Sequence, residues 1–177
     1  MSSDEATLSP QRAWAHVETV WEGRAAKVSP WLRGKRRVAD FGCGLMSLEK
    51  YIDETAEYVP IDVVPRDYRT IIVDFETEPL PKIDCDIAVM IGVLEYISDI
   101  PSVLAQLSLY PEAVISYNHF FIQDVLYALR LKPRRVSWKH RYSQRRFNSI
   151  IRQADLKVIE TRSVRLGECL YRVKPLR

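Results

Sequence analysis

The stretch from Val38 to Ile52, VADFGCGLMSLEKYI, constrains the fold of this chain more than any other. It begins with apolar residues, as a buried strand does, and it is broken by Gly42 and Gly44. From Leu45 onward the apolar spacing becomes helical and predicts a helix over residues 45–56. A strand that turns through glycines into a helix brings bare backbone N–H groups and a helix N-terminus close to a ligand. The stretch therefore predicts an α/β fold with a nucleotide-binding turn.

Two nucleotide-binding patterns compete at this turn. A dinucleotide-binding turn needs a third glycine three residues after Gly44, and Ser47 stands there instead. The other pattern has an acidic residue two places before the first glycine, and Asp40 occupies that place. It resembles motif I of the class I S-adenosylmethionine-dependent methyltransferases, Asp/Glu-x-Gly-x-Gly-x-Gly, with Met46 in place of the last glycine. The resemblance implies S-adenosyl-L-methionine as cofactor and S-adenosyl-L-homocysteine as product, with a first set of binding residues comprising Asp40, Gly42, Cys43 and Gly44.

Acidic residues also follow the next two predicted strands. Asp62 lies at the carboxyl end of the strand predicted over residues 58–63, and Asp74 follows the strand after it. In an open parallel sheet, ligands bind outside the carboxyl ends of the strands, where a carboxylate can accept both hydroxyl protons of a ribose. The resemblance implies that Asp62, with Val63 beside it, holds the adenosine sugar. It also implies that Asp74 bonds the adenine amino group while Phe75 packs on the adenine ring.

A third match comes after the continuous apolar run at residues 87–91, which predicts a central strand buried on both faces. The sequence GVLEYI at residues 92–97 resembles the motif that follows the fourth strand in this family, commonly Val-Leu-Glu-His-Ile, with Tyr96 replacing the histidine. The resemblance adds Gly92 to the cofactor-binding residues. Tyr96 is a candidate for orienting the acceptor or shielding the sulfonium, because aromatic faces attract cations. Glu95 is expected to be structural.

The resemblance covers about residues 35–175 and predicts a Rossmann-like, doubly wound fold. Its sheet has seven mostly parallel strands with an antiparallel C-terminal hairpin strand, and helices cover both faces. The whole chain, residues 1–177, is expected to be a single methyltransferase-like domain. Its expected parts are an N-terminal helix and cofactor lid (1–34), a cofactor-binding core (35–118), a substrate-side insertion (119–142), and a closing helix with strands (143–177).

The N-terminal part predicts a helix over residues 9–29 that ends at Ser29-Pro30, because a residue before proline avoids the helical region. One interpretation is a helix that only packs on the sheet. The other is that Trp21 and Arg24 close over the cofactor pocket. In the family that this chain resembles, a basic residue of such a helix meets the methionine carboxylate.

Further elements follow from spacing and cap signals. The predicted helices cover residues 101–109, 120–132 and 144–154, the last capped by Ser143, and the predicted strands lie at 70–73, 113–117, 156–159 and 169–173. His119 comes just after the strand at 113–117, at the edge where chemistry is expected. If the acceptor is a hydroxyl, a base must lie within hydrogen-bond reach of it, and His119 is the candidate base. A structural or surface role for His119 is an equal alternative.

Charge is unevenly distributed along a chain whose formal net charge is only +3. From Val125 to Ala154 there is no acidic residue, while basic residues recur through 130–146. This segment fits a solvated face, a site that captures an anionic substrate, or a docking surface for RNA or an acidic membrane. We favour methyl transfer to a small-molecule acceptor, anionic or sugar-like, over nucleic acid. The alternatives are an RNA or protein methyltransferase and, because of Met46, a non-catalytic S-adenosylmethionine-binding module.

The remaining features exclude several classes. No apolar run approaches the roughly 20 residues of a membrane helix, and the polar N-terminus has no secretory apolar region. The three cysteines are well separated in the sequence, so we expect free thiols in a reducing, cytoplasmic setting. No His, Cys and Asp spacing indicates a metal site. A homodimer is left open.

Overall fold

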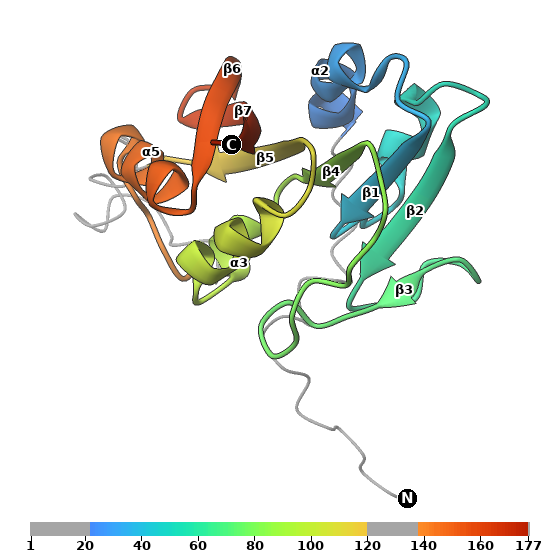
Figure 1. The fold of residues 1–177 in the computed structure, drawn as a ribbon, viewed down its shortest axis with the longest axis horizontal. Helices are drawn as coiled ribbons and strands as arrows, with labels where there is room; N and C mark the ends of the chain where they lie inside the picture. The colour runs from blue at the N-terminus through green and yellow to red at the C-terminus, as the bar shows by residue number, and fades with distance from the viewer. Residues whose placement is uncertain (1–21, 120–137, 177) are drawn as a thin grey trace, which may run out of the picture.

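The structure, a computed structural model, describes residues 22–119 and 138–176 of the 177-residue chain. At its centre is a seven-stranded sheet in the order β3-β2-β1-β4-β5-β7-β6 (Figure 1). The strands are β1 (Arg37–Phe41), β2 (Glu57–Asp62), β3 (Ile71–Ile72), β4 (Ile87–Met90), β5 (Ala113–Asn118), β6 (Leu156–Arg165) and β7 (Glu168–Pro175). The pairs from β3 through β5 are parallel, and β7 runs antiparallel to both of its neighbours. The predicted fold class is confirmed.

Helices cover both faces of this sheet (Figure 1). On one face, α2 (Glu22–Leu32) and the 3-10 helix η1 (Ser47–Tyr51) pack in one hydrophobic cluster. On the other, α3 (Ile100–Leu107), α5 (Gln144–Gln153) and the short 3-10 helix η2 (Leu94–Tyr96) pack in a larger cluster. The sheet is therefore the middle of three layers.

The central strand β4 shows why the core forms here. All four of its residues are buried, and they alternate between the two clusters: Ile87 and Val89 face α2, while Ala88 and Met90 face α3 and α5. A strand covered on both faces needs a continuous apolar run rather than an alternating one. The prediction of a central strand at 87–91 is confirmed.

Helix α2 is tied to the far edge of the sheet by polar contacts. Trp31 Nε1 donates to Glu160 of β6 at 2.8 Å, and the Arg162 guanidinium lies 4.5 Å from the centre of the Trp31 ring. Lys27 Nζ donates to the β6 carbonyls of Ser163 and Val164 at 2.9 and 2.7 Å. These contacts hold the first described helix against the last hairpin of the chain.

Two helix predictions were wrong in their bounds. The helix expected over 45–56 is only the five-residue 3-10 helix η1, because Met46 adopts a left-handed conformation (φ 56°, ψ 28°) and Ile52 is extended. Leu45, where the predicted helix begins, is 54% exposed. The helix expected to end at Ser29-Pro30 continues to Leu32, because a proline in the last turn removes only its own N–H bond while Trp31 and Leu32 gain burial.

Other element predictions are confirmed. Ser143 caps α5 by accepting a hydrogen bond from the Arg146 N–H at 3.3 Å, and the inward face of the helix buries Phe147, Ile150 and Ile151. The helix predicted over 120–132 and the N-terminal part of the 9–29 helix lie outside the described residues.

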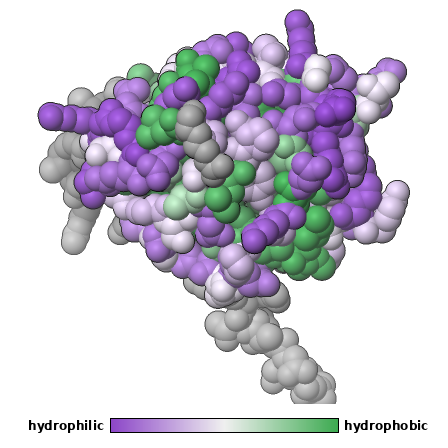
Figure 2. Space-filling model, viewed as in Figure 1, coloured by the Kyte–Doolittle hydropathy of each residue, from purple (hydrophilic) through white to green (hydrophobic). Residues whose placement is uncertain are grey.

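The face shown in Figure 2 is largely hydrophilic, and its apolar residues form separate patches. One patch lies at the β3 end of the sheet, where Ile71 and Ile72 are exposed. None of the helices within 22–119 and 138–176 is long and apolar enough to cross a membrane. Whether two copies of the chain associate stays a prediction.

A buried carboxylate anchors the amino end of β5. Glu112 is 2% exposed and accepts a hydrogen bond from Lys35 Nζ at 2.8 Å and an ion-pair contact from Arg172 Nε. Lys174 lies 3.7 Å away. Burial alone would raise the pKa of Glu112, but the hydrogen bonds from Arg172 and Lys35 outweigh it and hold the pKa below its usual range.

We predict that Glu112→Gln lowers the free energy of unfolding by about 1–3 kcal/mol near neutral pH, because it removes charge-assisted hydrogen bonds in a buried place. The folded-state pKa of Glu112 lies below its unfolded value. Its contribution is thus present above about pH 4.5 and is lost as the pH falls through the folded-state pKa. Urea unfolding of both proteins at several pH values measures this. The more exposed Lys174→Gln should cost about 0.5 kcal/mol or less. An equal loss at acidic and neutral pH would contradict the prediction.

Candidate functional site

The carboxyl ends of the parallel strands form the candidate site. The chain leaves β1 toward β2 on one side, whereas β4 pairs on the other side of β1, so the strand order reverses between β1 and β4. Ligands of open α/β sheets bind at such a switch point. A pocket that is partly open to solvent lies there and is lined by Gly42, Asp62, Val63, Asp74, Phe75, Glu76, Val93, Tyr96 and Ile97.

The floor of the pocket depends on Gly42. This residue has φ +78°, a conformation that favours glycine, and a β-carbon there would overlap the side chain of Val93. The Gly42 N–H donates to the Ile61 carbonyl of β2 at 2.7 Å. Gly42 therefore lets the turn after β1 pass closely between β2 and the segment after β4.

Asp62 is the buried carboxylate of the pocket. It is 2% exposed, and its two oxygens accept hydrogen bonds from two backbone N–H groups, Gly44 at 2.8 Å and Val64 at 3.0 Å. Arg66 Nε lies 3.7 Å from the same carboxylate. Cys43 Sγ lies 3.9 Å from Oδ2. These contacts fix the orientation of the carboxylate, which can still accept from a ligand hydroxyl.

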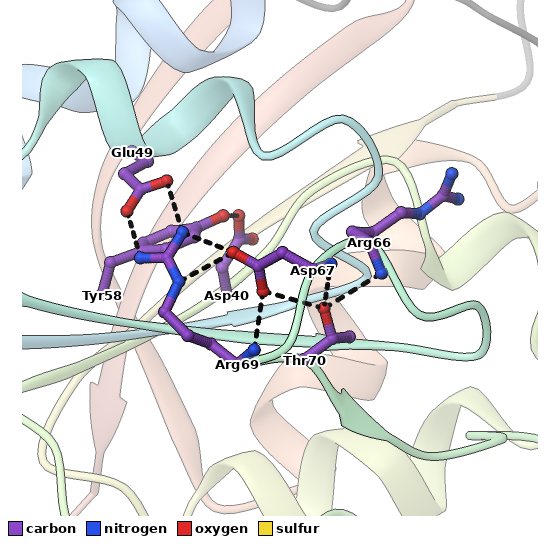
Figure 3. Close-up of polar contacts among 7 residues, drawn as sticks. All are labelled: Asp40, Glu49, Tyr58, Arg66, Asp67, Arg69 and Thr70. Atoms are coloured by element: carbon purple, nitrogen blue, oxygen red, sulfur yellow. Dashed lines mark hydrogen bonds and ion pairs between the residues drawn. The ribbon is translucent and has the colours of Figure 1, made fainter.

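The loop after β2 is held against η1 by the network in Figure 3. Arg69 pairs with Glu49 of η1 at 2.5 Å and with Asp67 at 2.7 Å. Thr70 Oγ1 accepts from the backbone N–H groups of Arg66 and Asp67 at 3.0 and 3.1 Å. This network closes the loop that begins with the predicted ribose-side residues Asp62 and Val63, and it joins that loop to η1, which follows the glycine turn.

The predicted adenine-side residues meet at the same pocket. Asp74 Oδ1 accepts from the Glu76 N–H at 3.0 Å, which makes a tight turn after β3. The Phe75 ring lies 6.0 Å from the buried Phe41 ring, so its edge is held by the core. Glu76 is paired with Lys139 at 2.6 Å. The described part of the segment at 138–142 is thus tied to the pocket wall.

Asp40 lies behind the pocket rather than in its lining. It is 2% exposed, accepts a hydrogen bond from the Tyr58 hydroxyl at 2.5 Å, and has no hydrogen bond to Oδ1 from the described residues (Figure 3). Burial raises the pKa of Asp40 to about 7; the Tyr58 bond opposes the rise and the negative charge of Asp62 adds to it. Cys43, also buried, has a raised pKa through burial and both carboxylates, so it stays a thiol.

Gly92 and Arg24 meet at the end of β4. Gly92 has φ +74°, and a β-carbon there would overlap Nη1 of Arg24. The Gly92 N–H donates to Ser116 Oγ at 2.7 Å. Arg24 is buried and pairs with Glu168. Trp21, predicted to close the pocket with Arg24, lies outside the described residues.

The two candidate catalytic residues have different surroundings. Tyr96 lines the pocket, and burial raises its pKa, so its hydroxyl stays protonated at neutral pH. His119 is not among the pocket-lining residues. Its Nε2 shares a 2.5 Å hydrogen bond with the Tyr171 hydroxyl, and its ring packs edge-on against Phe147. Burial lowers the pKa of His119, so its ring is neutral at neutral pH. Its role as a base stays a prediction.

Solved structures of methyltransferases share this architecture. The chain is 12% identical to magnesium protoporphyrin IX methyltransferase from Synechocystis PCC 6803, with a TM-score of 0.67 over 86% of this chain and 82% of that one. It is 14% identical to the putative methyltransferase solved with the Haloferax volcanii Trm112 activator, with a TM-score of 0.64 over 93% and 96%. No family model and no curated relative matches the sequence. The chain has the class I S-adenosylmethionine-dependent methyltransferase fold.

Some residues of this methyltransferase-fold site were missed in the sequence. Glu76, Val93 and Ile97 line the pocket, and all three lie beside residues that were singled out. Their positions in the sequence next to Phe75, Gly92 and Tyr96 could have identified them. Glu168 had no such signal, because its partner Arg24 is far away in the sequence.

Met46, which replaces the last motif glycine, keeps the backbone conformation of a glycine with φ 56°. Its side chain packs against the cluster under α2 and is not among the pocket-lining residues. We predict that Met46→Gly is more stable than Met46→Ala by about 1 kcal/mol, because a β-carbon is strained in this conformation. Thermal and urea unfolding measure the free energy of unfolding of the two variants, which differ only by the β-carbon at position 46. A more stable alanine variant would mean that the backbone is not strained here.

We predict that Asp40 makes stability depend on pH. Its folded-state pKa, about 7, lies above the ordinary aspartate value of 3.8, so its contribution is present at low pH and is lost as the pH rises toward 7. The free energy of unfolding of Asp40→Asn minus that of the wild type should therefore rise by about 1 kcal/mol or more between about pH 4 and pH 7. Glu112→Gln serves as the comparison with the opposite acid response. A pH-independent difference would show that Asp40 is ionised throughout.

Proposed function

We propose that this chain binds S-adenosylmethionine at the carboxyl ends of β1, β2, β3 and β4 and transfers its methyl group to a small-molecule acceptor. The observation that carries the proposal is Asp62: a buried carboxylate, oriented by two backbone N–H groups, that lines a pocket at the switch point of the sheet. A ribose with two adjacent hydroxyls fits such a carboxylate, because it can donate to both oxygens.

The neighbouring residues match the other parts of the cofactor. Asp74 and Phe75 supply a carboxylate and an aromatic ring for the adenine side of the pocket, on the same wall as Val63. The turn at Gly42 and Gly44 would receive the methionine part, beside Gly92 and the buried Arg24. The Synechocystis enzyme of the same fold was crystallised with S-adenosylhomocysteine, which supports this cofactor class.

Methyl transfer from a sulfonium requires little covalent chemistry from the protein. Most of the rate comes from holding the acceptor in line with the methyl group and excluding water. Tyr96 is the described residue best placed for this role, because it lines the pocket and its protonated hydroxyl can donate to an acceptor atom. Its ring also offers a face to the positive sulfur.

The acceptor that we propose is small and anionic or sugar-like. Arg145 and Arg146 are exposed at the beginning of α5, and no acidic residue lies between 138 and 154. Lys139 contributes less to this charge than the sequence indicated, because it is paired with Glu76. The residues at 130–135, which motivated much of the anionic-acceptor hypothesis, lie outside the described part of the chain.

We predict that Asp62→Asn weakens binding of S-adenosylmethionine and S-adenosylhomocysteine by about tenfold or more, because it removes a charged acceptor of two hydroxyl protons. Isothermal titration calorimetry of both ligands measures the loss. Asp84→Asn is the matched control: Asp84 is exposed and lies just before the amino end of β4, and its replacement should leave both affinities unchanged. If the wild type binds neither ligand, the proposed function is wrong. If Asp62→Asn binds both as tightly as the wild type, the ribose assignment is wrong.

A further inference from the structure

A buried ion pair joins the first described helix to the last strand of the chain. Arg24 of α2 and Glu168 at the beginning of β7 are 5% and 1% exposed, and Arg24 Nε contacts Glu168 Oε1. The other oxygen of Glu168 pairs with the more exposed Arg165 at 2.7 Å. Glu168 is thus a buried carboxylate with an arginine at each oxygen.

This pair lies beside the carboxyl end of β5, which is the neighbour of β4 in the sheet. Glu168 is the register partner of Asn118, the last residue of β5. Asn118 in turn donates to Glu95 Oε1 through its backbone N–H at 2.9 Å and its side chain at 2.6 Å. Glu95 is 1% exposed, and the positive charge of Arg24 is one of the influences that lower its pKa, against the larger effect of burial.

The guanidinium of Arg24 is aimed at the end of β4. Its Nε side is taken by Glu168, while its Nη1 end lies where a β-carbon of Gly92 would be. The residue after Gly92 is Val93, whose side chain lies where a β-carbon of Gly42 would be. Arg24, Gly92, Val93 and Gly42 therefore form a continuous row from the buried pair to the glycine turn.

A buried arginine needs such a partner to keep one position. An unpaired buried charge costs several kcal/mol, and an arginine side chain has many rotamers to lose when it is fixed. The planar guanidinium can donate to a carboxylate from one edge and still donate from its other nitrogens. An arginine held in this way is suited to a second carboxylate at the end of β4.

We propose that Glu168 is a positioning residue: through its ion pair it holds Arg24 against Gly92, where Arg24 receives the carboxylate of the methionine part of the cofactor. This inference rests on the proposed function, since it needs the cofactor to bind at the glycine turn. Glu168 itself makes no ligand contact in this scheme. It acts on the amino-acid end of the ligand and leaves the adenosine end unaffected.

The test compares two ligands that differ in the amino-acid part. S-adenosylhomocysteine carries the α-amino and carboxylate groups, and 5′-methylthioadenosine has the same adenosine and sulfur without them. We expect Glu168→Gln to weaken S-adenosylhomocysteine about tenfold or more and to leave 5′-methylthioadenosine within about twofold, both measured by calorimetry. A merely structural role would weaken both ligands alike, and that result overturns the proposal. Unchanged binding of S-adenosylhomocysteine overturns it as well.

Glu112→Gln is the matched control. Glu112 is an equally buried, ion-paired glutamate at the opposite end of β5. Its replacement shows what a loss of stability alone does to ligand binding, because it lies away from the proposed site. Its ratio of affinities for the two ligands should equal that of the wild type. If Glu168→Gln fails to fold, Glu168→Asp keeps the buried charge and shortens its reach. It should show a smaller loss, again confined to S-adenosylhomocysteine; an equal loss for both ligands would contradict the positioning role.

A double-mutant cycle separates positioning from direct contact. In an Arg24→Gln background, Glu168→Gln should cause no further loss of S-adenosylhomocysteine, because Glu168 acts only through Arg24. A further loss there means that Glu168 acts by another route. If the wild type binds S-adenosylhomocysteine more tightly than 5′-methylthioadenosine, the amino-acid part contributes to binding, and the cycle shows whether Glu168 acts through Arg24. If the wild type binds both equally and Glu168→Gln changes neither, only the positioning role fails. If it binds neither ligand, the proposed function fails first.

Discussion

The hydrogen bond from the Gly44 N–H to the Asp62 carboxylate is the contact on which the rest of the site depends. It joins the turn after β1 to the end of β2, two adjacent parallel strands whose register is set by their backbone ladder. A buried carboxylate without such donors would cost several kcal/mol, so the turn and the carboxylate stabilise each other. The Arg69 network then closes the next loop over the same turn. The pocket is consequently formed by strand ends that the backbone already holds in place.

Positive φ angles are concentrated around this site. Gly42, Met46 and Gly92 all have them, and at two of these positions a neighbouring side chain lies where a β-carbon would be. The strain at Met46 shows that the backbone path is set by the fold and not by the residue that occupies it. The side chain of Met46 packs into the cluster under α2. The motif can thus lose its last glycine without filling the described pocket.

Strand prediction succeeded where a pattern was local. The run at 87–91 and the strand ending at Asp62 are buried in the predicted places, because apolar residues between turn signals leave few alternatives in an α/β chain. Helix prediction failed at 45–56, where the apolar spacing was helical but the left-handed backbone at Met46 and the extended Ile52 leave only the five-residue η1. Asp62, Asp74 and Phe75 line one pocket for a similar local reason: each lies at or just after the end of a strand. Their roles toward a ligand stay predictions. His119 also follows a strand, but its ring is held by Tyr171 from a strand more than fifty residues later, which no local pattern shows.

The sequence by itself determined the order of the strands' apolar runs, the glycine turn after β1, and the acidic residues at the strand ends. These features depend on residue type and short spacing, and a parallel sheet accommodates each of them in one arrangement. Only the tertiary structure decided which buried charges meet. Arg24 and Glu168 lie at opposite ends of the chain and come together because β7 inserts beside β5 and α2 crosses the sheet above it. Such pairing depends on the path of the whole chain, since a buried charge is compensated by whatever side chain the fold brings to it.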